Sequence, residues 1–211
     1  TYEELPTPNV DNHMIATYID ADSNYYFLDA TGRYSIFGLP SSFILGKEAL
    51  IKKNATDYEI VTVPIIEPKQ NRIREKIKLS IDNKSLKGNA LASINGYNKT
   101  RFQYNIEDKT NEDKLKFYNI SFTKGHNKFI LTDFTEKNLY PSEKPLEISY
   151  NFYVDDYIMT NKNEMYINMN LDDLISDQKI KKDRENPIQY KYPQELENTI
   201  ELEIPEGWSV D

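Results

Sequence analysis

The residues best suited to chemistry lie in "DNHMIATYIDADSNYYFLDATGRY", which holds His13 near its start and Asp29 near its end. The segments "HMIATYI" and "NYYFLDA" are rich in β-branched and aromatic residues and predict two strands joined by a turn at "DAD". A hairpin in which Thr17 lies opposite Tyr25 also places His13 opposite Asp29, with Cβ atoms about 4.5–5.5 Å apart. This register predicts a hydrogen bond between imidazole and carboxylate, whereas a slip of one residue would put them on opposite faces.

An imidazole held by a carboxylate can be the base and orienting acid of a nucleophile–base–acid triad. The carboxylate fixes the ring tautomer and stabilises the imidazolium. A purely structural pair on a hairpin is the alternative interpretation. The nucleophile of such a triad cannot be a cysteine here, because the 211 residues include none. Disulfides and thiolate zinc sites are excluded for the same reason. Serine and threonine are present, but no G-x-S-x-G motif presents one of them as a nucleophile.

A metal site is another interpretation of the same segment. Asp11, His13 and Asp29 are possible ligands, but their spacing is unspecific and no second histidine is close in the sequence. The turn "IDADSN" lacks the central glycine and the bidentate glutamate of a calcium loop. The other histidine, His126, lies in the turn-like "TKGHNKF" and is expected at the surface. We therefore predict neither a metal nor a cofactor.

The elements that must position these residues are predicted to be mostly strands. Apolar and polar residues alternate in "DYEIVTVPI", "REKIKLSID", "NALASING", "LEISYNFYV", "NEMYINMNL" and "TIELEIP", with short turns between them. One helix is predicted over "TNEDKLKFYNISF", with Thr110 or Asn111 as its N-cap. A weaker helical turn is predicted in "LDDLISDQ". The predicted fold class is mainly β, with an antiparallel β-sandwich and one packed helix.

A domain boundary is predicted after residue 65. Pro64 and Pro68 each remove a backbone donor and favour extended backbone before them, as expected of a linker. The predicted domains are therefore residues 1–65 and 66–211.

Charge and hydropathy narrow the range of partners. The net charge of −8 and a pI near 5.0 argue against nucleic acid, which is bound by basic surfaces. The mean hydropathy is −0.71, and no apolar run approaches the roughly 18–20 residues that a membrane span needs. The sequence therefore predicts no nucleic-acid partner and no membrane span.

Residues 11–51 resemble the closing portion of a transglutaminase-like, papain-type core. The shared features are "NHMI" on one strand, "YFLDATGRY" on the next, then "FGLP" and a last strand at "GKEALI". In that family the histidine is the general base and the aspartate of "LDAT" orients it, which maps onto His13 and Asp29. The nucleophilic cysteine of the family lies upstream, at the start of a helix. This sequence begins after that point. The resemblance implies acyl transfer by an enzyme whose nucleophile is not in this chain.

Bacterial proteins of this type carry a β-rich domain of unknown function after the core. The segments "LKGNALASINGYNKTRF", "PLEISYNFYVDDY" and "NPIQYKYPQELENTIELEIPEGWSV" resemble successive parts of it. The resemblance implies a protein or peptide substrate, association with the upstream part of the same protein, and an exported or periplasmic location. We expect this chain alone to be inactive. Without the preceding helices, residues 1–65 must expose apolar surface or find a partner. The alternative function is a non-catalytic β-sandwich module for interaction or carbohydrate binding.

Overall fold

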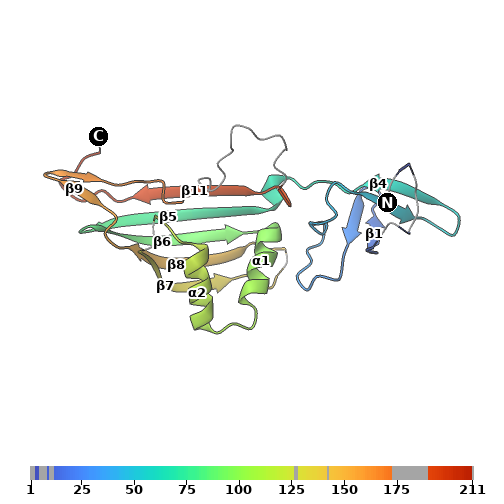
Figure 1. Ribbon diagram of the computed structural model, residues 1–211, viewed down its shortest axis with the longest axis horizontal. Coiled ribbons are helices and arrows are strands. Elements are labelled where there is room, and N and C mark those ends of the chain that lie inside the picture. Colours follow the sequence, from blue (N-terminus) through green and yellow to red (C-terminus); the bar gives the residue numbers. More distant parts are fainter. Residues whose placement is uncertain are drawn as a thin grey trace.

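The computed structural model describes residues 3–4, 9, 12–125, 128–141, 143–172 and 190–210 (Figure 1). Its largest unit is a five-stranded sheet with the strand order β11-β5-β6-β8-β7. Neighbouring strands pair antiparallel, except that β11 runs parallel to β5 along one edge. The strands of this sheet are β5 (Arg72–Asp82), β6 (Ser85–Ile94), β7 (Phe129–Lys137), β8 (Leu146–Val154) and β11 (Glu195–Leu202).

Alternation of side chains places the core on one face of this sheet. In β8, "LEISYNFYV", every second residue is buried, from Leu146 to Val154. Strands β5 and β6 follow the same period of two, which puts Ile77, Leu79 and Ala90 on the core face. The mainly-β class predicted from this alternation is confirmed.

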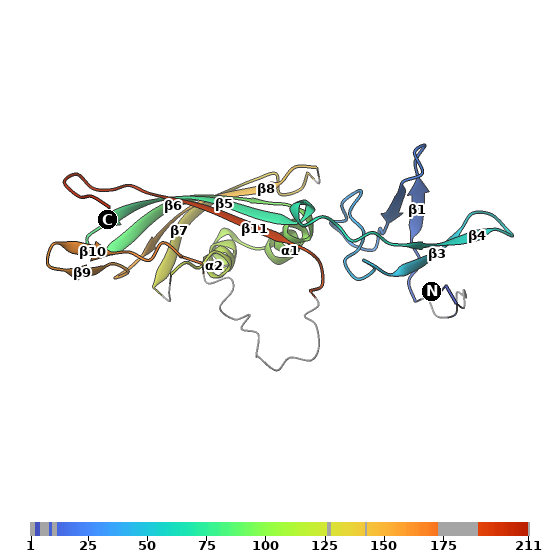
Figure 2. The same ribbon diagram turned by 90° about the horizontal axis from the view of Figure 1, so that it is seen from above.

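Two helices, α1 (Gly96–Ile106) and α2 (Asn111–Ser121), cover the core face of the sheet (Figure 2). Phe122, which ends α2, stacks on Tyr150 of β8 with ring centroids 4.7 Å apart. Thr110 is the N-cap of α2, and its hydroxyl accepts a hydrogen bond from the amide of Asp113 at 3.2 Å. The helix predicted over residues 110–122 is therefore confirmed.

Helix α1 differs from the sequence-based expectation. The sequence predicted a second sheet and one helix as the partners of the strands, whereas the layer on the core face consists of two helices. The amphipathic pattern of α1 is concealed because its buried residues include Asn98, Lys99 and Gln103. The Lys99 ammonium is satisfied by donating to the carbonyls of Pro141 and Lys144. Because polar residues occupy core positions, hydrophobic patterning did not predict this helix.

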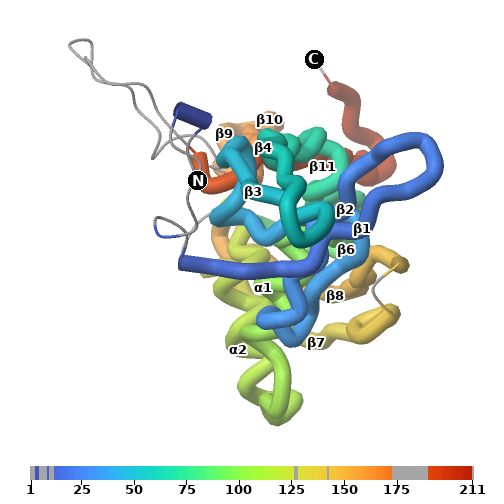
Figure 3. Tube along the Cα trace, turned by 90° about the vertical axis from the view of Figure 1, so that its right-hand side faces the viewer, coloured from blue at the N-terminus to red at the C-terminus, as the bar shows by residue number. Residues whose placement is uncertain are grey.

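Residues 12–66 form two β-hairpins beside one end of the sheet (Figure 1), the end that faces the viewer in Figure 3. Buried Phe27, Ile51 and Val63 form a small core of their own, separate from the core of the sheet. The two cores lie on either side of the predicted boundary after residue 65, which stays a prediction. The hairpins are β1 (Ala16–Ile19) with β2 (Tyr25–Leu28), and β3 (Glu48–Lys52) with β4 (Tyr58–Thr62).

Two smaller elements complete the described chain. A short 3-10 turn, η2 (Pro68–Gln70), leads from the hairpins into β5. A third hairpin, β9 (Met159–Asn161) with β10 (Glu164–Tyr166), lies at the far end of the sheet (Figure 1). The helical turn predicted in "LDDLISDQ" falls mainly on residues 173–178, which lie outside the described residues.

A tight joint connects α1 with the start of β5. The buried side chain of Asn71 donates to the carbonyl of Pro193 and accepts from the amide of Asn98, both at 2.9 Å. Gly96 lies against this side chain with a φ of 59°, and a Cβ there would lie 2.3 Å from the carbonyl oxygen of Gln70. Glycine is required, because any side chain would combine a left-handed backbone with a steric clash.

A buried charged cluster joins the sheet to the segment after α2. The Lys124 ammonium lies 2.6 Å from Glu75 Oε2 and 2.9 Å from Asp172 Oδ1. The hydroxyl of Tyr150 donates to the other oxygen of Glu75. Because the Lys124 and Glu75 side chains are only 3% and 4% exposed, each charge relies on these partners rather than on water.

We expect Gly96→Ala to lower the free energy of unfolding by more than about 2 kcal/mol. The left-handed backbone alone costs alanine about 1–2 kcal/mol, and the clash with Gln70 adds to it. Gly207→Ala is the matched control, because its φ is 85° but no atom of the described residues lies within 4 Å of its Cβ position. Equilibrium urea unfolding measures both variants. Equal losses would show that the contact with Gln70 costs nothing.

We expect Lys124→Met to lower the free energy of unfolding by about 3–5 kcal/mol, because Glu75 and Asp172 would stay buried without their cation. Lys128→Met is the control. Lys128 pairs with Asp156 at a similar 2.9 Å, but on the surface, where loss of a pair changes stability little. Urea unfolding compares the two variants, and similar effects would rule out a special role for the buried cluster.

Candidate active site

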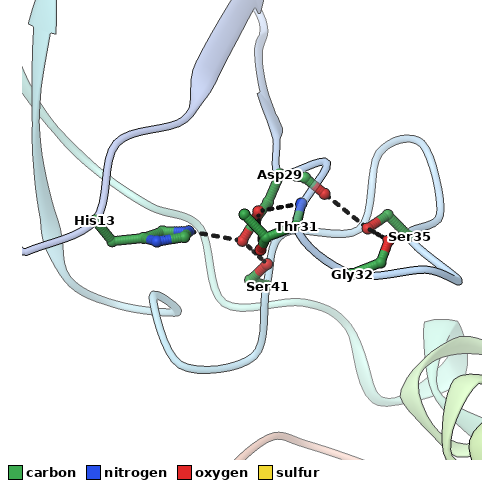
Figure 4. Close-up of polar contacts among 6 residues, drawn as sticks. All are labelled: His13, Asp29, Thr31, Gly32, Ser35 and Ser41. Atoms are coloured by element: carbon green, nitrogen blue, oxygen red, sulfur yellow. Dashed lines mark hydrogen bonds and ion pairs between the residues drawn. The ribbon is translucent and has the colours of Figure 1, made fainter.

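The carboxylate of Asp29 is buried and accepts four hydrogen bonds (Figure 4). Oδ1 accepts from the amide and the hydroxyl of Thr31 at 3.0 and 2.6 Å. Oδ2 accepts from the hydroxyl of Ser41 at 2.6 Å and lies 2.9 Å from Nε2 of His13. The Asp29 side chain is only 4% exposed, so these partners replace the water that an ionised carboxylate otherwise needs.

A loop that starts where β2 ends builds this environment. The bond from the Thr31 amide to Asp29 closes a turn of the kind that aspartate side chains commonly form two residues ahead. Ser35 then donates to the backbone carbonyl of Asp29 at 2.6 Å, which fixes the main chain of the same residue. Further along the same loop, Ser41 comes back to the carboxylate. We call residues 30–43 the dyad loop, after the pair formed by His13 and Asp29.

His13 approaches Asp29 from the extended segment before β1. Its ring meets the ring of Phe43 edge-on, with centroids 5.1 Å apart, and its side chain is 27% exposed. Figure 4 shows the imidazole pointing toward Asp29 from the side opposite Gly32 and Ser35. The hydrogen bond predicted between His13 and Asp29 is therefore present. We call these two residues the dyad, and their catalytic role stays a prediction.

The hairpin register behind that prediction is wrong by two residues. Thr17 lies opposite Phe27, not opposite Tyr25. Because side chains alternate with a period of two, a shift of two residues keeps each side chain on its face. His13 lies before the first paired residue of β1 and reaches Asp29 as a diagonal neighbour, a separation that a long side chain can span.

Electrostatics define the protonation state of the dyad. Burial acts to raise the pKa of Asp29, but hydrogen bonds from Ser41, from the side chain and amide of Thr31, and from His13 outweigh it. The pKa of Asp29 is held well below its usual range, so the carboxyl is ionised at neutral pH. An ionised carboxylate only accepts, and Nε2 of His13 must therefore carry the shared proton. In the neutral imidazole the lone pair then lies on Nδ1.

The other groups that bind Asp29 are hydroxyls and an amide. Thr31 and Ser41 donate their hydroxyls to Asp29, so both serve the acid. Within the described part of the chain, no group of three or more His, Asp or Glu residues could hold a metal ion. Asp11, a ligand in the metal interpretation, and His126 both lie outside the described residues.

Sequence reasoning missed two residues of the site, Thr31 and Ser41. Thr31 could have been found, because an aspartate followed two residues later by threonine is a common turn pattern, and here it falls in "LDAT". Ser41 gave no such signal, because it lies 12 residues from Asp29 and is one of several serines nearby.

Comparison of the chain with protein-family models, curated proteins and solved structures found no match. The resemblance to the transglutaminase-like family therefore rests on the residues themselves, chiefly "NHMI" and "YFLDATGRY". None of the described helices combines the length and the apolar character of a membrane span.

We expect Ser41→Ala to make the protein unfold at a less acidic pH. The pKa of Asp29 is lower in the folded chain than in the unfolded chain, so its stabilising contribution is complete above about pH 4 and is lost as the pH falls through the folded pKa. Removing the Ser41 donor raises the folded pKa of Asp29 and reduces this contribution. Circular dichroism during acid titration measures the midpoint.

Ser85→Ala is the control for this titration. Ser85 also donates to a carboxylate, that of Asp155 at 2.8 Å, but this pair is exposed. We expect its midpoint to match that of the unmodified protein. A midpoint for Ser41→Ala equal to that of Ser85→Ala would contradict the role given to Ser41.

Proposed function

We propose that His13 and Asp29 are the base and the orienting acid of a cysteine-dependent acyl-transfer site of the transglutaminase-like, papain type. The nucleophile comes from a segment outside this chain, and the chain by itself is inactive. The contact of 2.9 Å between Nε2 and Oδ2 carries the proposal, because it commits one ring nitrogen to the buried carboxylate and leaves Nδ1 as the base.

The proposed chemistry follows from this proton arrangement. The thiol gives its proton to Nδ1 of His13, and the resulting thiolate attacks the carbonyl carbon of an amide. The carbon–nitrogen bond breaks as the imidazolium returns a proton to the departing amine, which leaves a thioester. Water or a second amine then attacks the thioester and restores the thiol. Asp29 stays ionised throughout and stabilises the imidazolium.

The burial of the two side chains supports the role of His13 as the base and of Asp29 as the orienting acid. The carboxylate of Asp29 is nearly inaccessible, whereas the imidazole of His13 is 27% exposed and can meet a group from another segment. The apolar side chains beside His13 are also open, with Met14 94% and Phe43 48% exposed. Exposed apolar surface around a catalytic pair is what a site needs if another segment is to cover it.

A binding module is the second candidate function, and one observation favours it. Tyr18, Tyr26 and Phe37 form a row of aromatic rings, with centroids 5.8 and 5.1 Å apart, and Tyr18 and Phe37 are 51% and 69% exposed. Open aromatic rings of this kind can stack on a sugar ring. This function would require the row and would not require His13.

The test joins or mixes this chain with the segment that supplies the cysteine. We expect His13→Ala to slow alkylation of that cysteine by iodoacetamide at pH 6 by at least about tenfold, because the thiolate is stabilised by a paired imidazolium. Asp29→Asn should lower amide turnover by about 10³-fold or more, because it favours the wrong tautomer. His126→Ala, which changes the other histidine of the chain, is the control.

Two results would contradict the proposal. An alkylation rate that does not change in His13→Ala would show that the imidazole does not activate the thiol. Sugar binding that survives His13→Ala but is lost in Tyr18→Ala or Phe37→Ala would instead favour the binding module.

A further inference from the structure

The dyad loop is held between the dyad and helix α1. Its first part carries Thr31 and its last part carries Ser41, both of which donate to Asp29. The loop therefore sets two of the three residues that bind the carboxylate. The opposite side of the loop faces helix α1, which packs on the five-stranded sheet (Figure 2). Any group that fixes the loop also fixes the acid of the dyad.

Helix α1 presents a row of hydroxyl-bearing residues to this loop. Tyr97, Thr100 and Tyr104 are spaced three and four residues apart, so they lie on one face of the helix. The Thr100 hydroxyl lies 3.4 Å from the carbonyl of Tyr34, and the Tyr104 hydroxyl accepts from the amide of Arg33 at 2.8 Å.

Two further contacts hold the same part of the loop. The rings of Tyr34 and Tyr104 meet edge-on with centroids 5.0 Å apart, and Arg33 forms an ion pair with Glu107 just beyond α1.

Tyr97 acts at the other end of the loop, next to the acid. Its hydroxyl donates to the carbonyl of Pro40, the residue directly before Ser41. Ser41 in turn donates to Oδ2 of Asp29, the same oxygen that binds His13. A continuous path of hydrogen bonds and one peptide unit therefore links α1 to the imidazole. Burial raises the pKa of Tyr97, with a smaller contribution from Tyr192, so its hydroxyl stays protonated and able to donate.

These few contacts matter because the loop is not embedded in a packed core. A cleft of about 400 Å³ lies between the loop and α1, and its lining includes Ser41, Tyr34 and all three α1 residues named above. Along this cleft the loop lacks close packing against α1, so dispersion contacts fix it less firmly there. Its position therefore depends strongly on the hydrogen bonds from α1 to Arg33, Tyr34 and Pro40.

We propose that helix α1 positions the dyad, and that Tyr97 is the positioning residue that acts on it through Pro40 and Ser41. The part of the chain that contains the five-stranded sheet and α1 thereby controls the geometry of the base–acid pair, which lies in residues 12–66. The catalytic meaning of this control rests on the proposed function, whereas the control of dyad geometry does not.

The test uses the whole chain labelled with ¹⁵N-histidine. Nuclear magnetic resonance measures the exchange of the Nε2 proton of His13 with water in the unmodified protein and in Tyr97→Phe. We expect Tyr97→Phe to speed this exchange about two- to tenfold, the range that corresponds to losing one hydrogen bond. Its free energy of unfolding should stay close to that of the control below, since the ring still packs.

Tyr157→Phe is the matched control, because the Tyr157 hydroxyl also donates to a backbone carbonyl, that of Asn168 at 2.9 Å, away from the dyad loop. We expect its exchange rate to equal that of the unmodified protein. An unchanged rate in Tyr97→Phe would overturn the proposal. If Tyr97→Phe does not fold, Tyr104→Phe replaces it, because it frees the Arg33 amide on the same loop. An unchanged rate there would also overturn the proposal.

The measurement separates this inference from the proposed function. Proton exchange at His13 requires neither a cysteine nor a substrate. Faster exchange in Tyr97→Phe, together with an alkylation rate that is independent of His13, would support positioning and reject acyl transfer. Unchanged exchange with a His13-dependent alkylation rate would reject positioning and support acyl transfer.

Discussion

The side chain of Asn71 fixes the point at which three distant parts of the chain meet. It binds the start of α1 through the amide of Asn98 and the segment before β11 through the carbonyl of Pro193. The backbone carbonyl of Asn71 also accepts from the amide of Glu195, where β11 begins. Because an unpaired polar group is costly at a fully buried position, this amide tolerates little movement of its partners. The direction of α1, and with it the tyrosine face toward the dyad loop, follows from this joint.

The protein buries carboxylates in two ways, and the difference bears on chemistry. Glu75 pairs with Lys124 at 2.6 Å, and Lys124 also pairs with Asp172 at 2.9 Å. Asp29 is held by hydroxyls and an amide from Thr31 and Ser41, and only His13 among its partners can become charged. In the first arrangement the carboxylates share an ammonium group. In the second, a buried carboxylate binds one nitrogen of an imidazole, which is the geometry that the proposed function requires.

The sequence predicted much of the fold because the strands repeat a period of two and α2 has a clear N-cap. It predicted β8 well because all nine residues alternate. It could not predict α1, whose Lys99 and Gln103 occupy buried positions that hydrophobic patterning assigns to apolar residues. The return of β11 to pair in parallel with β5 also left no local signal, because parallel pairing depends on distant segments.

The candidate site shows the same limits. His13 and Asp29 were predicted as a pair from their residue types and from the hairpin, although the register was shifted by two residues. The predicted contact is present all the same, because a shift of two residues leaves His13 and Asp29 on the same face of the hairpin. Ser41 and Tyr97 could not be predicted, since each reaches the site through a loop or helix whose path depends on tertiary packing. Short-range turn chemistry is readable in one sequence, but contacts across loops are not.

The parallel strand β11 also imposes an order on biosynthesis. Strands β5 and β6 are joined by a two-residue turn and can pair as soon as both leave the ribosome. The partner of Arg74 in β11, Glu197, is made 123 residues later. Until then one edge of β5 is open, and Asn71 lacks its contact with Pro193. Closing so long a loop is slow. The contact of Asn71 with Pro193 therefore forms only after the β1–β2 hairpin and the β5–β6 pair have been synthesised.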